Sequence, residues 1–211
     1  MFSSTHLAYQ SFLVDPTLVT ALEKLYFEHV RLGQVRDNFK EMEPLIRDAD
    51  LISFDLSAIQ SSVAPGAVDA QPFGLSGEEA SQICWFAGSN EKLSSFGVYG
   101  YDPNYDDTHN KTAQVAAVMI WYFIEGFYSR KDTLSFKSAA YMKYTVSMDS
   151  KPNTLVFYKS KRSGKWWMEI PYNDASRFER VSIVPCSYSD YQQAQQGEIP
   201  ERWVTAQIKL Y

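Results

Sequence analysis

A short apolar run near the start of the chain limits the folds that this sequence can adopt. Residues Leu51–Leu56 are largely apolar, and polar residues followed by a Pro65-Gly66 pair come after them. A run of this length between turn signals is typical of a strand that is buried in a parallel sheet. Asp55 lies at the carboxyl end of the run, where open α/β sheets bind their ligands. The run therefore predicts an α/β fold with a candidate site at Asp55.

The residues around this run alternate between strand and helix patterns. Strands are expected over 5–14, 26–31, 50–56 and 93–99, and helices over 16–25, 34–47, 77–88 and 107–129. This alternation predicts parallel strands that are joined by right-handed helical crossovers. The helix over 107–129 is apolar nearly all round, so we expect it to be largely buried.

Several of these helices carry recognisable end signals. Asp15 is expected to cap the first helix, with Pro16 at its first position. Ser76 and Glu79 have the spacing of a capping box, and Gly88 is a suitable residue to end the helix that follows. These signals fix two helix starts without reference to the rest of the fold.

The pattern changes near Lys131. From there, short strands are expected over 141–148, 154–159, 165–170 and 180–184, followed by a helix over 187–196. Lys161–Gly164 has the composition of a hairpin turn. We therefore divide the chain into an α/β domain over 1–130 and a β-rich extension over 131–211.

Composition and charge exclude several classes of partner. The net charge of −5 gives no general basic field, so we expect no nucleic-acid binding. No apolar run approaches the ~20 residues of a membrane helix, and no signal peptide is evident. Cys84 and Cys186 are expected to be buried thiols, because two cysteines do not form a disulfide framework. These observations predict a cytoplasmic protein that binds no membrane.

Three segments resemble a known family. The segments Ser53–Ser57, Ala64-Pro65-Gly66 and Gly74–Ser76 resemble the last metal-binding segment of the ureohydrolases (arginase, agmatinase, formimidoylglutamase). The resemblance extends over about residues 5–130 and implies a partial parallel arginase-like sheet flanked by helices. In that family the two aspartates of a D-x-D motif bind a pair of manganese ions. A hydroxide bridging the ions attacks the carbon of a guanidine or amidine.

The sequence departs from the family at the residues that carry this chemistry. Asp55 matches the first metal ligand, but Ser57 and Gln60 stand where the family has further aspartates. Gly100 stands where the family has a glutamate that binds the substrate's guanidinium group. A neutral hydroxyl cannot replace an anionic ligand at similar affinity. The resemblance therefore implies a vestigial ligand at Asp55, no catalytic residue, and no cofactor unless a complete manganese site exists.

Other parts of the family's site are absent from the sequence. The motifs G-G-x-H and D-A-H-x-D do not occur, and the three histidines, His6, His29 and His109, lack a chelating spacing. In the family fold, a strand from the N-terminal half lies between the third strand expected here and the first two. Without that strand, two strand edges have to pair with each other or with another segment.

Two functions are compatible with these features. One is a non-catalytic interaction or assembly subunit, whose partner is another protein, the missing N-terminal half or a second copy. The other is part of a manganese-dependent amidine hydrolase acting on formimidoylglutamate or a similar substrate, with the missing half supplied elsewhere. Asp102, Asp106 and Asp107 lie close to Gly100. We expect them to form a solvated loop that caps the following helix, and not to replace the family's glutamate.

Overall fold

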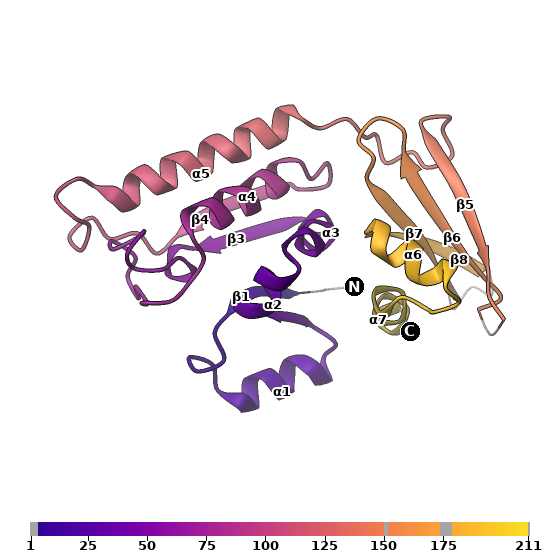
Figure 1. Cartoon of the computed structure of the whole chain (residues 1–211), viewed down its shortest axis with the longest axis horizontal. Helices are drawn as coiled ribbons and strands as arrows, with labels where there is room; N and C mark the ends of the chain where they lie inside the picture. The colour runs from indigo at the N-terminus through magenta and orange to yellow at the C-terminus, as the bar shows by residue number, and fades with distance from the viewer. Residues whose placement is uncertain (1–3, 150–151, 174–178, 211) are drawn as a thin grey trace. The chain divides into compact units, whose positions relative to one another are not determined.

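The described part of the chain forms two compact units. The structure is a computed structural model, and it describes residues 4–149, 152–173 and 179–210. The first unit comprises Ser4–Arg130, and the described residues from Lys131 onward belong to the second (Figure 1). No helix within these ranges is long and apolar enough to cross a membrane.

The first unit is an α/β assembly. In chain order it contains β1 (Thr5–Tyr9), α1 (Pro16–Lys24), β2 (Glu28–Arg31), α2 (Leu32–Asp37), η1 (Phe39–Glu41), α3 (Met42–Arg47), β3 (Leu51–Asp55), η2 (Leu56–Ala58), α4 (Gly77–Gly88), β4 (Ser95–Tyr99) and α5 (Lys111–Tyr128). β1 pairs in parallel with β2, and β3 pairs in parallel with β4. These are two separate two-stranded sheets, and no ladder joins them within the described ranges. The predicted α/β class with parallel strands is confirmed, but the strands do not form one continuous sheet.

The predicted helix starts at Asp15 and Ser76 are confirmed. Asp15 Oδ1 accepts the backbone N–H of Thr17 at 2.8 Å, and Pro16 is the first residue of α1. Ser76 Oγ accepts the N–H of Glu79 at 3.1 Å, while Glu79 Oε2 accepts the N–H of Ser76 at 2.7 Å. Both signals depend only on neighbouring residues, which is why the sequence reveals them.

The single helix expected over 34–47 is wrong. The chain instead forms α2, the short 3-10 helix η1 and then α3. Pro44 lies inside α3 and has no N–H, so it cannot donate the hydrogen bond to Lys40 that would continue one helix through this region. The strand expected over 5–14 is also shorter, because residues 11–13 form a turn.

Helices α4 and α5 pack closely against each other because of two glycines. A Cβ atom on Gly126 would overlap the carbonyl oxygen of Trp85, and one on Gly88 would overlap that of Phe123. The two helix backbones therefore touch at this crossing. Phe123 also stacks on Phe96 of β4, with 4.6 Å between the ring centroids. These contacts place α5 over the β3–β4 pair.

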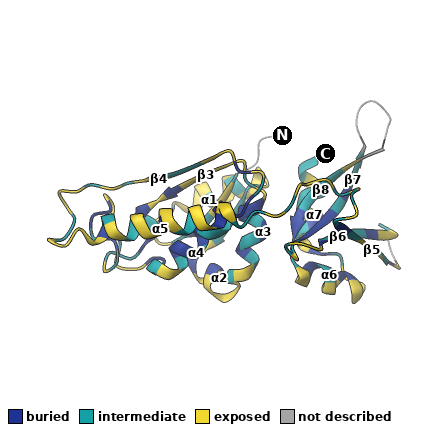
Figure 2. Cartoon of the chain, turned by 90° about the horizontal axis from the view of Figure 1, so that it is seen from above, coloured by how far each residue is buried: buried dark blue, intermediate teal, exposed yellow. Residues whose placement is uncertain are grey.

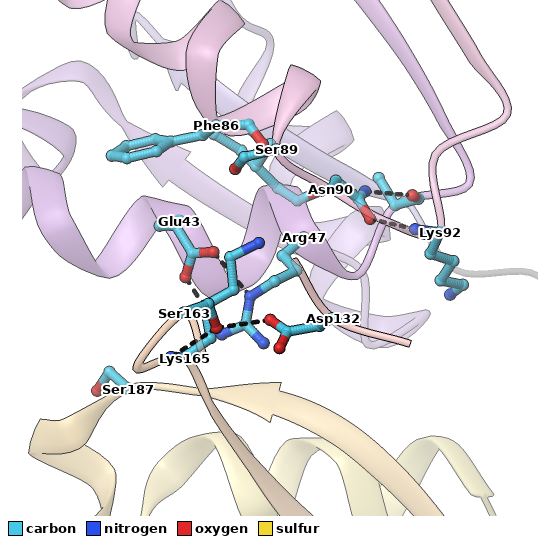
Figure 3. Close-up of polar contacts among 12 residues, drawn as sticks. Glu43, Arg47, Phe86, Ser89, Asn90, Lys92, Asp132, Ser163, Lys165 and Ser187 are labelled. Carbon is cyan, nitrogen blue, oxygen red and sulfur yellow. Dashed lines mark hydrogen bonds and ion pairs between the residues drawn. The ribbon is translucent and has the colours of Figure 1, made fainter. Parts of the chain in front are cut away.

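Asn90 joins the ends of two helices. It follows α4, is fully buried, and its Nδ2 donates to the carbonyl oxygens of Ile46 at 3.0 Å and Ala49 at 2.8 Å (Figure 3). Its Oδ1 accepts the N–H of Lys92 at 2.8 Å. These bonds satisfy carbonyl groups at the end of α3 and fix the entry of the chain into β3.

The expectation that the helix over 107–129 is largely buried is wrong. The helix begins at Lys111, and its buried residues are Thr112, Met119 and Gly126. Figure 2 shows exposed residues along much of its length. Apolar residues surround the helix, but only one side meets α4 and β4. An apolar face is therefore left in contact with solvent.

The second unit is the β-rich appendage. It contains β5 (Tyr141–Ser147), β6 (Thr154–Ser160), β7 (Trp166–Asn173), β8 (Glu179–Cys186), α6 (Tyr188–Gln195) and α7 (Glu201–Leu210). The strands form one antiparallel sheet in the order β5-β6-β7-β8. The predicted hairpin turn between β6 and β7 is confirmed, with Gly164 at a φ of +76°. Helix α7 was not expected from the sequence, yet its Trp203 is buried with Phe157 and Met168 of the sheet.

Candidate functional site

Asp55 and Gly100 meet at the carboxyl ends of two paired strands. Asp55 of β3 lies opposite Tyr99 of β4, and Gly100 follows directly. Gly100 has a φ of +79°, and a Cβ atom built on it would lie 2.8 Å from Asp55 Oδ1. The carboxylate of Asp55 therefore lies in the space that the Cβ atom of any other residue at position 100 would need. The positive φ and this close approach favour glycine at position 100, and a larger residue there would strain the backbone and displace the Asp55 carboxylate.

Ser57 lies beside Asp55 and holds its carboxylate. Asp55 Oδ1 accepts the backbone N–H of Ser57 at 2.8 Å and so caps η2. Gln60 lies further along the loop, where its N–H donates to the carbonyl oxygen of Leu75 at 3.1 Å. The structure thus brings Asp55, Ser57 and Gly100 together, while the backbone of Gln60 ties the loop to the residues before α4.

The loop Ala64-Pro65-Gly66 connects the strand end to the start of α5. Ala64 is fully buried. The N–H of Gly66 donates to Thr112 Oγ1 at 2.7 Å, and the carbonyl oxygen of Gly66 accepts the N–H of Asp102 at 2.9 Å. The contact with Thr112 has no signal in the sequence, because it joins residues that only the fold brings together.

Asp106 is held in its charged form by the start of α5. Its Oδ1 accepts the N–H of Thr112 at 3.0 Å, and its Oδ2 accepts the N–H of Ala113 at 3.2 Å. Tyr101 also donates its hydroxyl to Oδ2 at 3.2 Å. Burial raises the pKa of Asp106, but the hydrogen bonds outweigh it and lower the pKa to about 2. The carboxylate is therefore committed to the helix end.

Asp107 plays a similar part. Its Oδ1 accepts the N–H of Lys111 at 2.9 Å and that of His109 at 3.1 Å, and the bond from Lys111 lowers the pKa of Asp107. Asp102 accepts the N–H of Asn104 at 2.8 Å. The predicted cap on the following helix is confirmed for Asp106 and Asp107.

The groups at this strand end do not fit a manganese pair on their own. Among the residues that the structure describes, no three His, Cys, Asp or Glu side chains gather closely enough to hold a metal ion. His6 and His29 face each other across β1 and β2, and His109 precedes α5. A divalent ion of this kind prefers several anionic oxygen ligands, and Asp55 offers one carboxylate.

The two cysteines lie in the interior of the chain. Cys84 and Cys186 are both buried, as the sequence predicts. Burial raises the pKa of the Cys84 thiol to about 12, so it is protonated at neutral pH. A protonated, buried thiol is not a nucleophile.

Comparison with known proteins gives one family and one fold. The family model described as "Arginase family" matches residues 18–125, just over half of the chain. No curated protein matched the chain significantly.

Solved structures of two enzymes have the same fold. A manganese-containing crystal structure of formiminoglutamase from Trypanosoma cruzi matches with a TM-score of 0.54 and 23% identity, over 62% of this chain and 46% of that one. Formimidoylglutamase from Bacillus subtilis matches with a TM-score of 0.54 and 20% identity, over 60% of this chain and 42% of that one. The chain thus spans less than half the length of these enzymes.

We expect the substitution Gly100→Ala to destabilise the first unit. The positive φ alone costs a residue with a Cβ about 1–2 kcal/mol, and the overlap with Asp55 adds to that cost. The double variant Asp55→Ala/Gly100→Ala removes the overlap, so it should lose less stability than the two single changes together. Urea unfolding of the four proteins measures this coupling. Strictly additive losses would contradict the contact between Asp55 and Gly100.

We also expect acid to remove stability that Asp106 provides. Its pKa is about 2 in the folded state against an ordinary value of 3.8, so its contribution is complete above about pH 4 and is lost as the pH falls toward 2. Unfolding free energies measured across this range should depend less steeply on pH in Asp106→Asn than in the parent chain. The exposed carboxylate variant Asp69→Asn serves as the control. An equal slope in Asp106→Asn and the parent would contradict the capping role.

Proposed function

The chain belongs to the arginase family, and we propose that it acts there as a non-catalytic member, an interaction or assembly subunit that a protein partner completes. The observation that carries this proposal is the divided sheet of the first unit. Four parallel strands are present, but they form two separate pairs.

The divided sheet leaves two strand edges able to bind an extended segment. β1 and β3 contribute to one apolar core, to which Leu7, Ala8 and Phe54 belong, yet no ladder joins the two strands. Parallel pairs are less stable than antiparallel ones, and a sheet of two strands is marginal by itself. An open edge presents a row of N–H and C=O groups, which a strand from a partner can pair with. The family fold places such a strand between these two pairs.

The chemistry of the strand end supports a pseudoenzyme. Ser57 and Gln60 replace anionic ligands, and Gly100 replaces the residue that would bind a cationic substrate group. A glutamate at position 100 would adopt a positive φ and displace the Asp55 carboxylate from its present place, so restoring it would disturb the strand end. We infer that the retained carboxylate at Asp55 now supports η2 and not a metal ion.

One alternative has a specific observation in its favour. The manganese-containing formiminoglutamase of T. cruzi has the same fold, and Asp55 is retained here. The chain would then be part of a manganese-dependent hydrolase of formimidoylglutamate or a similar amidine, with the remaining ligands supplied by the missing half. To test this, the chain is mixed with the separately produced N-terminal half of the T. cruzi enzyme and manganese, and amidine hydrolysis is followed. We expect no turnover above that of the half alone.

The divided sheet is tested by amide hydrogen exchange in the purified chain, followed by NMR. In a parallel strand only every second N–H faces a given neighbour. Along Leu51–Asp55 we therefore expect protected and rapidly exchanging amides to alternate, and the same along Thr5–Tyr9. Protection of consecutive amides in both strands would show that the edges are already paired and would overturn the proposal that a partner strand is needed.

A further inference from the structure

The exposed side of α5 carries a continuous apolar strip. The large side chains on it are exposed to between 47% and 82%, and they are Val118, Ile120, Trp121, Ile124, Phe127 and Tyr128. Figure 2 shows exposed positions along the length of α5. No charged residue occurs between Lys111 and Glu125. Solvated helix faces normally carry charged side chains, so this face is typical of a contact surface.

The spacing along the strip fits a helix as the partner. Ala117, Trp121, Ile124 and Tyr128 are separated by four, three and four residues, which is the seam spacing of two helices packed nearly along each other. All four are on the exposed side, opposite the buried Met119 and Gly126. Val118 and Glu125 border the seam on one side, and Ile120 and Phe127 border it on the other.

The area of the strip is sufficient for a stable pair. Aromatic side chains carry about 150–250 Å² each, so the three aromatic residues alone leave roughly 350–400 Å² at their exposed fractions, and the smaller aliphatic side chains bring the face to on the order of 600 Å². Two such faces together bury about 1,200 Å², which is at the lower end of the range for specific interfaces. The strip thus reaches the size of a small specific interface.

We propose that α5 is a homodimer interface, in which a second copy of this chain lays its own α5 antiparallel along the first. If the two-fold axis passes between Trp121 and Ile124, each Trp121 meets the Ile124 of the other copy. The small Ala117 then lies opposite the large Tyr128, so the two seams are complementary in size.

The parallel alternative is less favourable. It places Trp121 against Trp121 and Tyr128 against Tyr128, while the two Ala117 side chains leave a gap between them. It also aligns the two helix dipoles in the same direction. The antiparallel pair avoids both costs and leaves Glu125 at the edge of the interface.

The proposed dimer is independent of the strand-edge proposal above. It uses a helix face and leaves the edges of β1 and β3 open, so either proposal can fail while the other stands. The glycine crossing of Gly88 and Gly126 supports the dimer, because it fixes the rotation of α5 and keeps the same strip turned outward.

The test is the mass of the full chain by analytical ultracentrifugation, from low to high micromolar concentration. We expect a reversible dimer in the parent chain. The double variant Trp121→Glu/Ile124→Glu should weaken it by at least about 30-fold, as is typical when central contacts are lost. Tyr105→Glu, which changes a side chain that is 66% exposed in the loop after β4, should leave the dimer unchanged. Because the two substituted residues are exposed, circular dichroism should show an unchanged fold.

Cysteine cross-linking tests the direction of the helices. In an antiparallel pair, Ala117→Cys and Tyr128→Cys should cross-link to each other when the two variants are mixed, and each should cross-link poorly alone. The native cysteines are buried and do not interfere. A parent chain that stays monomeric at every concentration, a dimer that survives the double glutamate variant, or efficient cross-linking of each variant with itself would overturn the proposed pair. In the first case another segment or partner covers α5.

Discussion

The parallel pairing of β3 with β4 is the constraint on which the rest of the first unit depends. It brings the carboxyl ends of the two strands together, so Asp55 and Gly100 come into contact. It requires a crossover helix, and α4 provides it. After β4 the chain passes through the loop that contains Asp102, Asp106 and Asp107 and continues as α5. The close contact at Gly88 and Gly126 holds α5 against α4. The site, the helix layer and the exposed strip of α5 all follow from this one pair of strands.

The carboxylates at this strand end have structural partners. Asp55 accepts an N–H of η2, and Asp106 accepts two N–H groups at the start of α5. Both use the general affinity of a carboxylate for the free N–H groups of a helix end. A carboxylate that also served as a metal ligand would have to divide its lone pairs between these bonds and the ion. The arrangement is consistent with a family member that has kept the shape of the strand end and lost the other charged groups around it.

The sequence predicts best those features that depend on near neighbours. The caps at Asp15 and Ser76 and the turn that ends at Gly164 follow from local hydrogen bonding and backbone preference. The exposure of α5 and the contact between Asp55 and Gly100 were missed because each depends on packing between distant segments. For α5, the sequence shows which residues are apolar, but it does not show how many sides of the helix pack against other helices or strands. The expectation that the site is degenerate rests on Ser57, Gln60 and Gly100, and only the family's pattern supplies the reference for it.

The manganese content of the purified chain tests the central claim most directly. The chain would be dialysed against manganese, passed through a desalting column and analysed for metal and protein, with Asp55→Ala as the control. We predict that the chain retains far less than one ion per molecule and that Asp55→Ala retains the same amount. Retention of one or two ions per chain, lost in Asp55→Ala, would show that Asp55 belongs to a complete metal site and would contradict a non-catalytic role.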